Sequence, residues 1–174
     1  TRGPVSEPTS SLLADTICRT VELGVTIVDA AAGDRFTHLW CELVAPDPRC
    51  PGCGVAGRLR DPVGRELTGL PVTGYPTRLH LRIPRLVCAN DGCATTIFRA
   101  CTDPVAAPRV AVTRRTTRWI LQRLALDRMS VSAVSKALGL SWNTVNTLAL
   151  DAIRTIVYDD GHLDGVRVLG VDEH

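Results

Sequence analysis

Two close pairs of cysteines constrain this chain more than any other feature of its sequence. The first pair lies in Cys50-Pro51-Gly52-Cys53-Gly54, and the second lies in Cys88-Ala89-Asn90-Asp91-Gly92-Cys93. Each spacing fits a tight turn with both sulfur atoms facing a common centre, and the long insert must fold back to bring the pairs together. A tetrahedral four-cysteine zinc site needs this arrangement. We therefore expect one structural Zn²⁺ ion, bound by Cys50, Cys53, Cys88 and Cys93.

The residues around these cysteines favour tight turns. Pro51 and Gly52 suit the first turn, and we expect Gly54 and Gly92 to take the positive φ that such turns demand. The alternatives are a disulfide framework and a redox Cys-x-x-Cys motif. A redox motif would open a helix after a strand in a βαβ pattern, and this sequence has no such pattern.

Three more cysteines, Cys18, Cys41 and Cys101, have no close partner in the sequence. In a reducing cytosol, seven cysteines favour metal binding over disulfides. We expect these three to be buried as small hydrophobic residues.

The length and composition describe a globular chain. Its 174 residues can form one domain or two small ones, and 45% of them are hydrophobic. The sequence has neither an apolar run long enough to cross a membrane nor a basic-then-apolar signal peptide. We therefore expect no membrane partner and a cytoplasmic location.

The net charge of +2 conceals an uneven distribution along the chain. Residues 1–48 contain three Arg and seven acidic residues, for a charge of −4. Residues 49–128 contain 14 Arg and five acidic residues, for a charge of +9, and residues 129–174 carry −3. A local basic block is the usual electrostatic footprint of a nucleic-acid-binding protein. A solvated face of an Arg-rich protein is the alternative, and the acidic flanks argue against it.

Strand patterns precede and surround the cysteine pairs. After a short helix through Leu12–Val21, the residues from Val25 to Val44 predict a β-hairpin. Residues 66–70 and 77–87 predict two strands joined through residues 71–76, and residues 95–99 predict a third. Leu79, Leu81 and Ile83 alternate with polar residues and should face a core. Strands between and after two such cysteine turns make a zinc ribbon.

A helical period begins at Thr113 and predicts three helices. The first begins near Arg114, the second spans about residues 130–138, and the third runs from Trp142 to about residue 158. Gly139 fits the turn between the last two, with Ser135 at their close crossing, Leu140 in the core and Ser141 as the next N-cap. This pattern is typical of a helix-turn-helix, although an ordinary helical hairpin uses similar caps.

In a helix-turn-helix, the exposed N-terminal face of the third helix would enter the DNA major groove. The residues on that face are Trp142, Asn143, Asn146 and Thr147, and Asn can bond adenine through two hydrogen bonds. We expect the first helix to contact phosphates through Arg114, Arg115 and Arg118.

The last residues, from Val166 to His174, predict a strand that ends in acidic residues. A buried strand needs partners in a sheet, and no further strand follows in the sequence. We therefore expect this segment to be the first strand of a domain that the chain does not contain.

The order of these motifs resembles the N-terminal part of bacterial insertion-sequence transposases of the ISL-three family. The resemblance covers about residues 40–174. Its more specific parts are the ribbon, with Cys50-Pro51-Gly52-Cys53-Gly54, Arg85-Leu86-Val87-Cys88 and Ile97-Phe98, and the ending Gly170-Val171-Asp172-Glu173-His174.

The resemblance implies a function and a set of partners. It implies that the ribbon and the helix-turn-helix recognise double-stranded DNA at the terminal inverted repeats of the element. It also implies an RNase H-like domain that cuts and joins DNA with three carboxylates and Mg²⁺ or Mn²⁺, of which Asp172 matches the first carboxylate. The chain alone should then be inactive as an enzyme, should associate with the bacterial nucleoid and could pair as a homodimer.

The predicted fold class is α+β. We expect a tail and β-hairpin over residues 1–44, a zinc ribbon over 45–104, an all-α helix-turn-helix domain over 105–162, and over 163–174 the start of a truncated RNase H-like domain. Two other functions stay open. One is a stand-alone DNA-binding regulator without catalytic activity, and the other is a zinc-stabilised protein-interaction module. Inverted repeats flanking the gene would favour the transposase.

Overall fold

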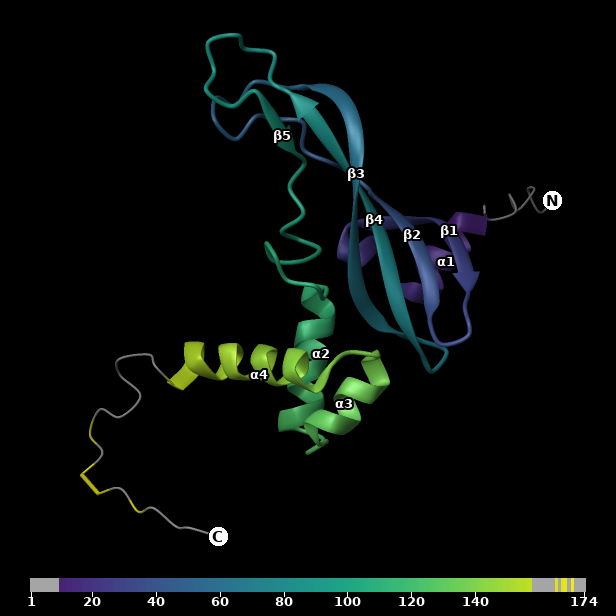
Figure 1. Ribbon diagram of the computed structural model, residues 1–174, viewed down its shortest axis with the longest axis vertical. Helices are drawn as coiled ribbons and strands as arrows, with labels where there is room; N and C mark the ends of the chain where they lie inside the picture. Colours follow the sequence, from purple (N-terminus) through teal and green to yellow (C-terminus); the bar gives the residue numbers. More distant parts are fainter. Residues whose placement is uncertain (1–9, 158–164, 166, 169, 171–174) are drawn as a thin grey trace, which may run out of the picture.

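The computed structural model describes residues 10–157, 165, 167, 168 and 170, and it has the predicted α+β composition (Figure 1). A β-sheet with an N-terminal helix comes first, and helices follow. In chain order the elements are α1 (Ser10–Cys18), the 3-10 helix η1 (Val21–Leu23), β1 (Val25–Ala32), β2 (Thr37–Leu43), β3 (Arg58–Val72), β4 (Tyr75–Val87), β5 (Ile97–Arg99), α2 (Arg114–Ala125), α3 (Val131–Leu138) and α4 (Trp142–Val157).

The named strands of the described residues form one five-stranded sheet in the order β1-β2-β4-β3, with β5 also paired to β4. The hairpin predicted between Val25 and Val44 is present as antiparallel β1 and β2. In addition, β2 runs parallel to β4, from Thr37 opposite Thr77 to Glu42 opposite Arg82. This pairing crosses the boundary predicted between residues 44 and 45. The hairpin therefore extends the sheet of the ribbon strands.

The strands β3 and β4 run the length of the sheet (Figure 1). One end of the sheet carries the two cysteine turns, residues 50–54 and 88–93, and is called the zinc end below. Leu79, Leu81 and Ile83 on β4 are each at most 3% exposed, as their alternation predicts. The strand β3 begins at Arg58, eight residues before the predicted start. The turn at its end is also shorter than predicted, because Val72 already pairs with Tyr75.

A buried carboxylate attaches the N-terminal helix to the sheet. Asp15 on α1 is 4% exposed and accepts hydrogen bonds from the Ile27 N–H at 2.8 Å, the Thr26 hydroxyl at 2.6 Å and the Thr20 hydroxyl. Burial raises the pKa of Asp15, but these three donors outweigh it and hold that pKa below the usual carboxyl value. Asp15 is therefore ionised at neutral pH. It bonds to Thr20, which precedes η1, and to Thr26 and Ile27 in β1.

The three C-terminal helices pack around a second core of four fully buried residues, which are Ile120, Val134, Leu138 and Val145. Their boundaries agree with the predicted ones at Arg114, Leu138 and Trp142. On α4, Val145 and Ala149 are turned inward and are 0% and 8% exposed.

The helices dock against the end of the sheet that lies opposite the zinc end (Figure 1). The guanidinium of Arg78 on β4 lies 4.4 Å from the centre of the Phe36 ring and donates to the Gly139 carbonyl at 2.8 Å. The Thr116 hydroxyl on α2 donates to the Thr68 carbonyl on β3 at 3.2 Å. Sheet and helices are thus joined by specific polar contacts as well as by the connecting chain.

In the described part of the chain, no helix is long and apolar enough to span a membrane. The strand predicted from Val166 onward falls mainly outside the described residues. Asp172, Glu173 and His174 at its end all lie outside them.

Candidate metal centre and nucleic-acid interface

The four cysteines of the two predicted turns come together at the zinc end of the sheet. Their Sγ atoms all lie within 4.8 Å of one another, with Cys50 and Cys93 at 3.9 Å and Cys53 and Cys88 at 3.5 Å. Sulfur atoms bound tetrahedrally to zinc, at about 2.3 Å each, stand about 3.8 Å apart. A disulfide would need about 2.05 Å. The spacing fits one shared metal ion and excludes disulfides between these sulfurs.

The first cysteine turn closes through its own backbone. The Gly54 N–H donates to the Cys50 carbonyl at 2.8 Å, and Gly54 has a φ of +74°, as predicted. Gly52 is needed for space, because a Cβ there would stand 2.7 Å from the Thr95 hydroxyl and 3.2 Å from the Cys93 sulfur. The absent side chain lets the two turns approach each other closely.

The second turn is closed by the Asn90 side chain and not by a left-handed Gly92, which we expected. Gly92 does not have a positive φ, so that prediction is wrong. Asn90 makes the turn instead, because its side-chain oxygen accepts from the Gly92 N–H at 3.0 Å and its carbonyl accepts from the Cys93 N–H at 3.1 Å. An Asn side chain can replace a backbone group in this way and removes the need for a left-handed residue.

The protein environment shifts the pKa values of the Cys50 and Cys88 thiols in opposite directions. Burial raises the pKa of Cys50, but N–H donors from Gly52 and Cys53 outweigh it and lower that pKa to about 7. For Cys88, the N–H of Asn90 lowers the pKa, while burial and the neighbouring thiols raise it further, to about 12. The Cys50 thiolate therefore forms readily, whereas the Cys88 thiolate needs a nearby cation. A zinc ion supplies that positive charge.

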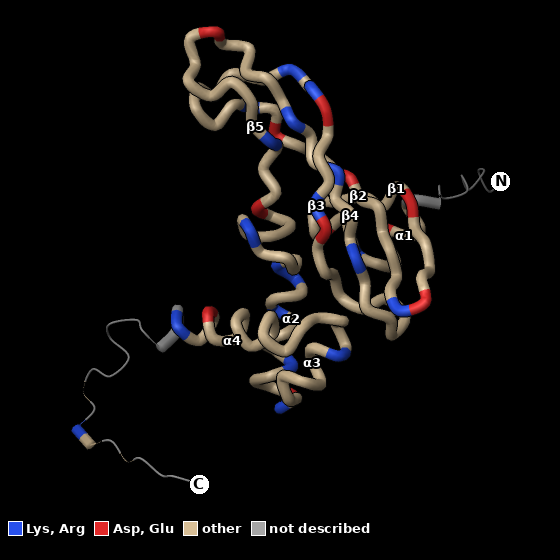
Figure 2. The backbone as a smooth tube through the Cα atoms, in the orientation of Figure 1, with Lys and Arg blue, Asp and Glu red and all other residues tan. Residues whose placement is uncertain are grey.

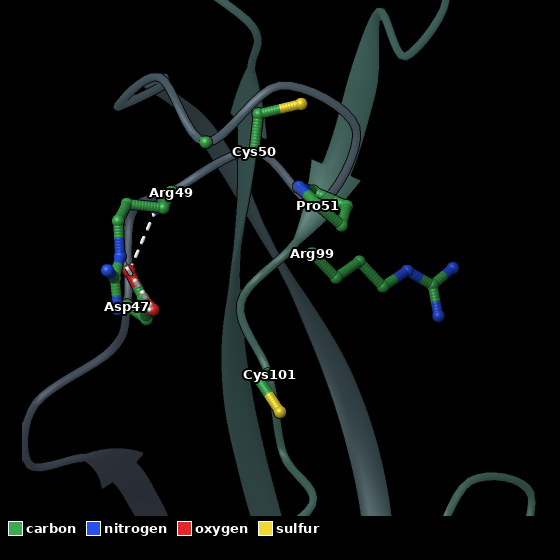
Figure 3. Close-up of a pocket in the computed structure, with 7 residues that line it drawn as sticks. Asp47, Arg49, Cys50, Pro51, Arg99 and Cys101 are labelled. Carbon is green, nitrogen blue, oxygen red and sulfur yellow. Dashed lines mark hydrogen bonds and ion pairs between the residues drawn. The ribbon is translucent and has the colours of Figure 1, made fainter.

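The other cysteines differ in burial. Cys41 is fully buried, and this burial raises its pKa to about 12, whereas Cys18 is half-buried. Cys101 is exposed, so its predicted burial is wrong. Its side chain points away from Cys50 across a surface hollow beside the zinc end (Figure 3). Cys101 lies two residues after the end of β5, where the chain leaves the core.

The helix-turn-helix has the predicted capping residues. Gly139 ends α3 with a φ of +59°, and the Ser141 side chain accepts from the Thr144 N–H at 3.1 Å at the start of α4. Ser130 caps α3 by accepting from the Ala133 N–H. Ser135 is 8% exposed and Leu140 packs on the helical core, as their positions predict. These contacts fix the angle at which α4 leaves the turn.

The predicted reading face of α4 is accessible. Trp142 is 49% exposed, Asn143 and Thr147 are exposed, and Asn146 is half-buried. The opposite face of the helix holds the buried Val145. The side chains on the accessible face offer amide and hydroxyl groups, which can hydrogen-bond to base edges.

The three arginines predicted to contact phosphates have different surroundings. Arg118 is exposed. Arg114 is exposed too, and its side chain donates to the Asp103 carbonyl. Arg115 instead turns inward and donates to the carbonyls of Cys18 and Arg19, the latter at 2.9 Å. Burial lowers the pKa of Arg115. Its guanidinium thus ties α2 to the N-terminal segment.

Basic residues occur along the chain from the zinc end of the sheet, through the connecting segment, to the helices (Figure 2). The exposed arginines in these regions are Arg49, Arg58, Arg60, Arg82, Arg99, Arg109, Arg114, Arg118 and Arg128. Sequence reasoning did not single out Arg99 or Arg109 from this block. Their placement depends on the path of residues 100–112, and the sequence gives no periodic signal there.

Comparison with known families matches both parts of the chain. Residues 46–93 match the model described as the zinc-finger of transposase IS204/IS1001/IS1096/IS1165. Residues 104–153 match the model described as the helix-turn-helix domain of transposase family ISL3, the ISL-three family. No curated protein and no solved structure gave a match. The two matched segments contain the four clustered cysteines and the helices α2 and α3 with most of α4.

Proposed function

The chain belongs to the ISL3 family of transposases, and we propose that it binds double-stranded DNA sequence-specifically at the terminal inverted repeats of a mobile element. The observation that carries the proposal is the accessible face of α4. Asn143 and Thr147 stand exposed there, at the N-terminal end of a helix whose other face is buried. In helix-turn-helix proteins, this end of the second motif helix reads bases in the major groove.

The exposed arginines supply the positive charge that such an interface needs to contact DNA phosphates. Phosphate contacts give affinity and orientation without reading sequence, while base contacts provide the discrimination. We assign phosphate contacts to Arg114 and Arg118 on α2. Arg115 has an internal role, because its donors are directed to backbone carbonyls. The zinc ion is structural in this proposal, and it stabilises the folded ribbon.

Selection from a random duplex pool tests the proposal. The zinc-loaded chain should enrich one sequence, and that sequence should match the inverted repeats at the ends of the element that encodes the protein. Asn143→Ala should cost about 1–3 kcal/mol on the enriched duplex and little on a scrambled one. Gln122→Ala, at an exposed position on α2, is the matched control. If Asn143→Ala and Asn146→Ala leave discrimination unchanged, α4 is not the reader.

The assignment of Asp172 remains a proposal that rests on the family resemblance, because this residue lies outside the described part of the chain. We propose that it is the first of three carboxylates that bind Mg²⁺ or Mn²⁺ for DNA cleavage and joining. In a transposase that contains all three, Asp172→Asn should abolish cleavage at the repeat ends and leave DNA binding intact. Retained cleavage would contradict the assignment.

The homodimer likewise stays a prediction. Sedimentation of the chain, with and without the enriched duplex, would distinguish one bound copy from two.

A further inference from the structure

Three hollows on the surface form a series from the zinc end of the sheet to the reading helix. The first is lined by Arg49, Cys50, Pro51 and Arg99, among others (Figure 3). The second is lined by Arg65, Arg99, Thr102 and Arg109. The third is lined by Arg109, Asn143, Thr144 and Thr147. Arg99 borders the first two and Arg109 borders the last two, so these arginines link the hollows into one path.

Arg99 adds a second positive charge where β4 and β5 pair. It ends β5 directly opposite Arg85 on β4, and like charges in this arrangement are destabilising. Asp61 on β3 neutralises Arg85 through a bidentate ion pair. Arg99 is exposed, and it has no acidic partner within the residues that the structure describes. Its side chain extends away from Arg49 and Cys101 (Figure 3). A bound anion would neutralise the charge of Arg99, as Asp61 neutralises that of Arg85.

Arg109 is held in a strained backbone conformation. Its φ is +62°, which non-glycine residues rarely adopt and which persists only where the surrounding structure imposes it. Here Arg65 imposes it, since its guanidinium donates to the carbonyls of Ala107 and Val110, both at 2.8 Å, on either side of Arg109. A third bond, to the Thr102 hydroxyl at 3.1 Å, fixes the same segment. Arg65 is therefore a positioning residue for Arg109.

The Arg109 side chain is exposed beside the reading face of α4, and no ion-pair partner occurs for it among the described residues. The two acidic residues that line the three hollows are already paired. Asp47 accepts from Arg49, and Asp151 accepts from Arg154. The path therefore offers two free positive charges, at Arg99 and Arg109, and this charge is complementary to a polyanion.

We propose that Arg99 and Arg109 contact consecutive stretches of the phosphate backbone of one DNA duplex that passes from the zinc end of the sheet to the reading face of α4. This inference rests on the proposed function and extends it. The ribbon and the helix-turn-helix contact one continuous duplex, and the segment between them contributes to the interface through Arg109. The polar contacts between sheet and helices keep the two ends of this path at a fixed separation.

The test is the salt dependence of binding to a short mixed-sequence duplex, measured with the zinc-loaded chain between about 50 and 200 mM salt. Each lost phosphate contact lowers the magnitude of the slope of log K against log salt by about 0.9. Arg99→Gln and Arg109→Gln should each lower it by about that amount, and the double variant should lower it by about 1.8. Arg99→Lys and Arg109→Lys retain the charge and should retain the slope.

Arg35→Gln is the matched control, because Arg35 is exposed in the turn between β1 and β2 and lines none of the three hollows. It removes the same charge and should leave the slope unchanged. Zinc content and circular dichroism would establish that each variant is folded.

The outcomes separate this inference from the proposed function. If the unaltered chain selects and discriminates a duplex while the Gln variants keep its slope, the phosphate path is overturned and the proposed function stands. If the chain does not bind duplex DNA, both fail. If an acidic poly-glutamate peptide binds through Arg99 and Arg109 and duplex DNA does not, the path belongs to an acidic protein partner.

Discussion

Single polar side chains make several of the long-range connections in this protein. Arg78 connects the sheet to the helix-turn-helix turn, and Arg115 connects α2 to the N-terminal segment. Asp15 connects α1 to β1. Such groups lose their hydration on burial, and the hydrogen bonds that they make offset that cost.

Replacement of Asp15 should make this dependence measurable. Asp15→Asn removes the charge that three donors surround, and we expect a loss of about 1.5–3 kcal/mol at neutral pH. Because the folded pKa of Asp15 is below its unfolded value, the charged form stabilises the fold above the unfolded pKa. This stabilisation is lost as the pH falls through the folded pKa. The difference between the two proteins in urea unfolding should therefore shrink in acid.

Asp34→Asn is the control for that series, since Asp34 is exposed in the turn between β1 and β2. It should unfold like the unaltered protein at every pH. An equal loss for Asp34→Asn, or a loss for Asp15→Asn that persists in acid, would contradict the assigned role of Asp15.

Zinc binding should depend on the clustered cysteines alone. Cys50→Ser removes one of four thiolate ligands, and we expect the purified protein to lose its zinc and the ribbon end to lose its order. Cys101→Ser should retain one zinc per chain, because that thiol is exposed and points away from the cluster (Figure 3). Elemental analysis of both variants measures the number of zinc ions per chain. Zinc affinity should also fall on acidification, because protons compete for the thiolates.

At the scale of elements, two turns with left-handed glycines serve different purposes. Thr73 and Gly74 both have positive φ in the turn between β3 and β4, as two-residue hairpin turns of type I′ require. Gly139 has a positive φ too, but it is packed against the sheet. A Cβ on Gly139 would stand 2.5 Å from a Phe36 ring carbon, whereas a Cβ on Gly74 would meet nothing within 4 Å.

This difference gives a matched pair of substitutions. Gly74→Ala should cost about 1–2 kcal/mol for the left-handed conformation alone. Gly139→Ala should cost more than Gly74→Ala, because the added methyl group must also displace the Phe36 ring from its contact with Arg78. Thermal unfolding of the two variants measures the difference. Equal losses would mean that the contact between turn and sheet contributes little to stability.

At the scale of the whole molecule, zinc and the docking contacts stabilise opposite ends of one sheet. The cysteine cluster lies at one end of β3 and β4, and the helices pack at the other (Figure 1). The buried core of the sheet reaches the cluster through Cys50 and Cys88, but most of its members, such as Leu67, Leu79 and Leu81, are apolar side chains that bind no metal. Loss of zinc should therefore disorder one end and leave the other in place.

Hydrogen exchange with and without a chelator tests that expectation. Removal of zinc should abolish protection in residues 50–57 and 88–97, which form the two cysteine turns and their flanks. Protection should persist in β4 from Thr77 to Ile83 and in α2. Simultaneous loss of protection in α2 would mean that the metal stabilises the entire molecule.

Much of the candidate site could be predicted from the sequence, because its determinants are local. Cysteine spacing defines two turns, and the four ligands follow from the coordination preference of zinc. Alternation defines the buried face of β4, and the residues around Gly139 define the helix-turn-helix turn by their caps. Each of these signals lies within a few residues of the feature that it predicts.

Tertiary structure alone decided which residues meet across long distances in the chain. The parallel pairing of β2 with β4 has no local signal, because any exposed strand edge offers the same backbone groups. The arginines are equivalent in sequence, and only the packing directs Arg65 and Arg115 inward and leaves Arg99 and Arg109 outward. The sequence by itself determined the cysteine cluster, the helix-turn-helix turn and the helices. Folding decided which charges stay free, because burial and hydrogen-bond partners come from segments far apart in the chain.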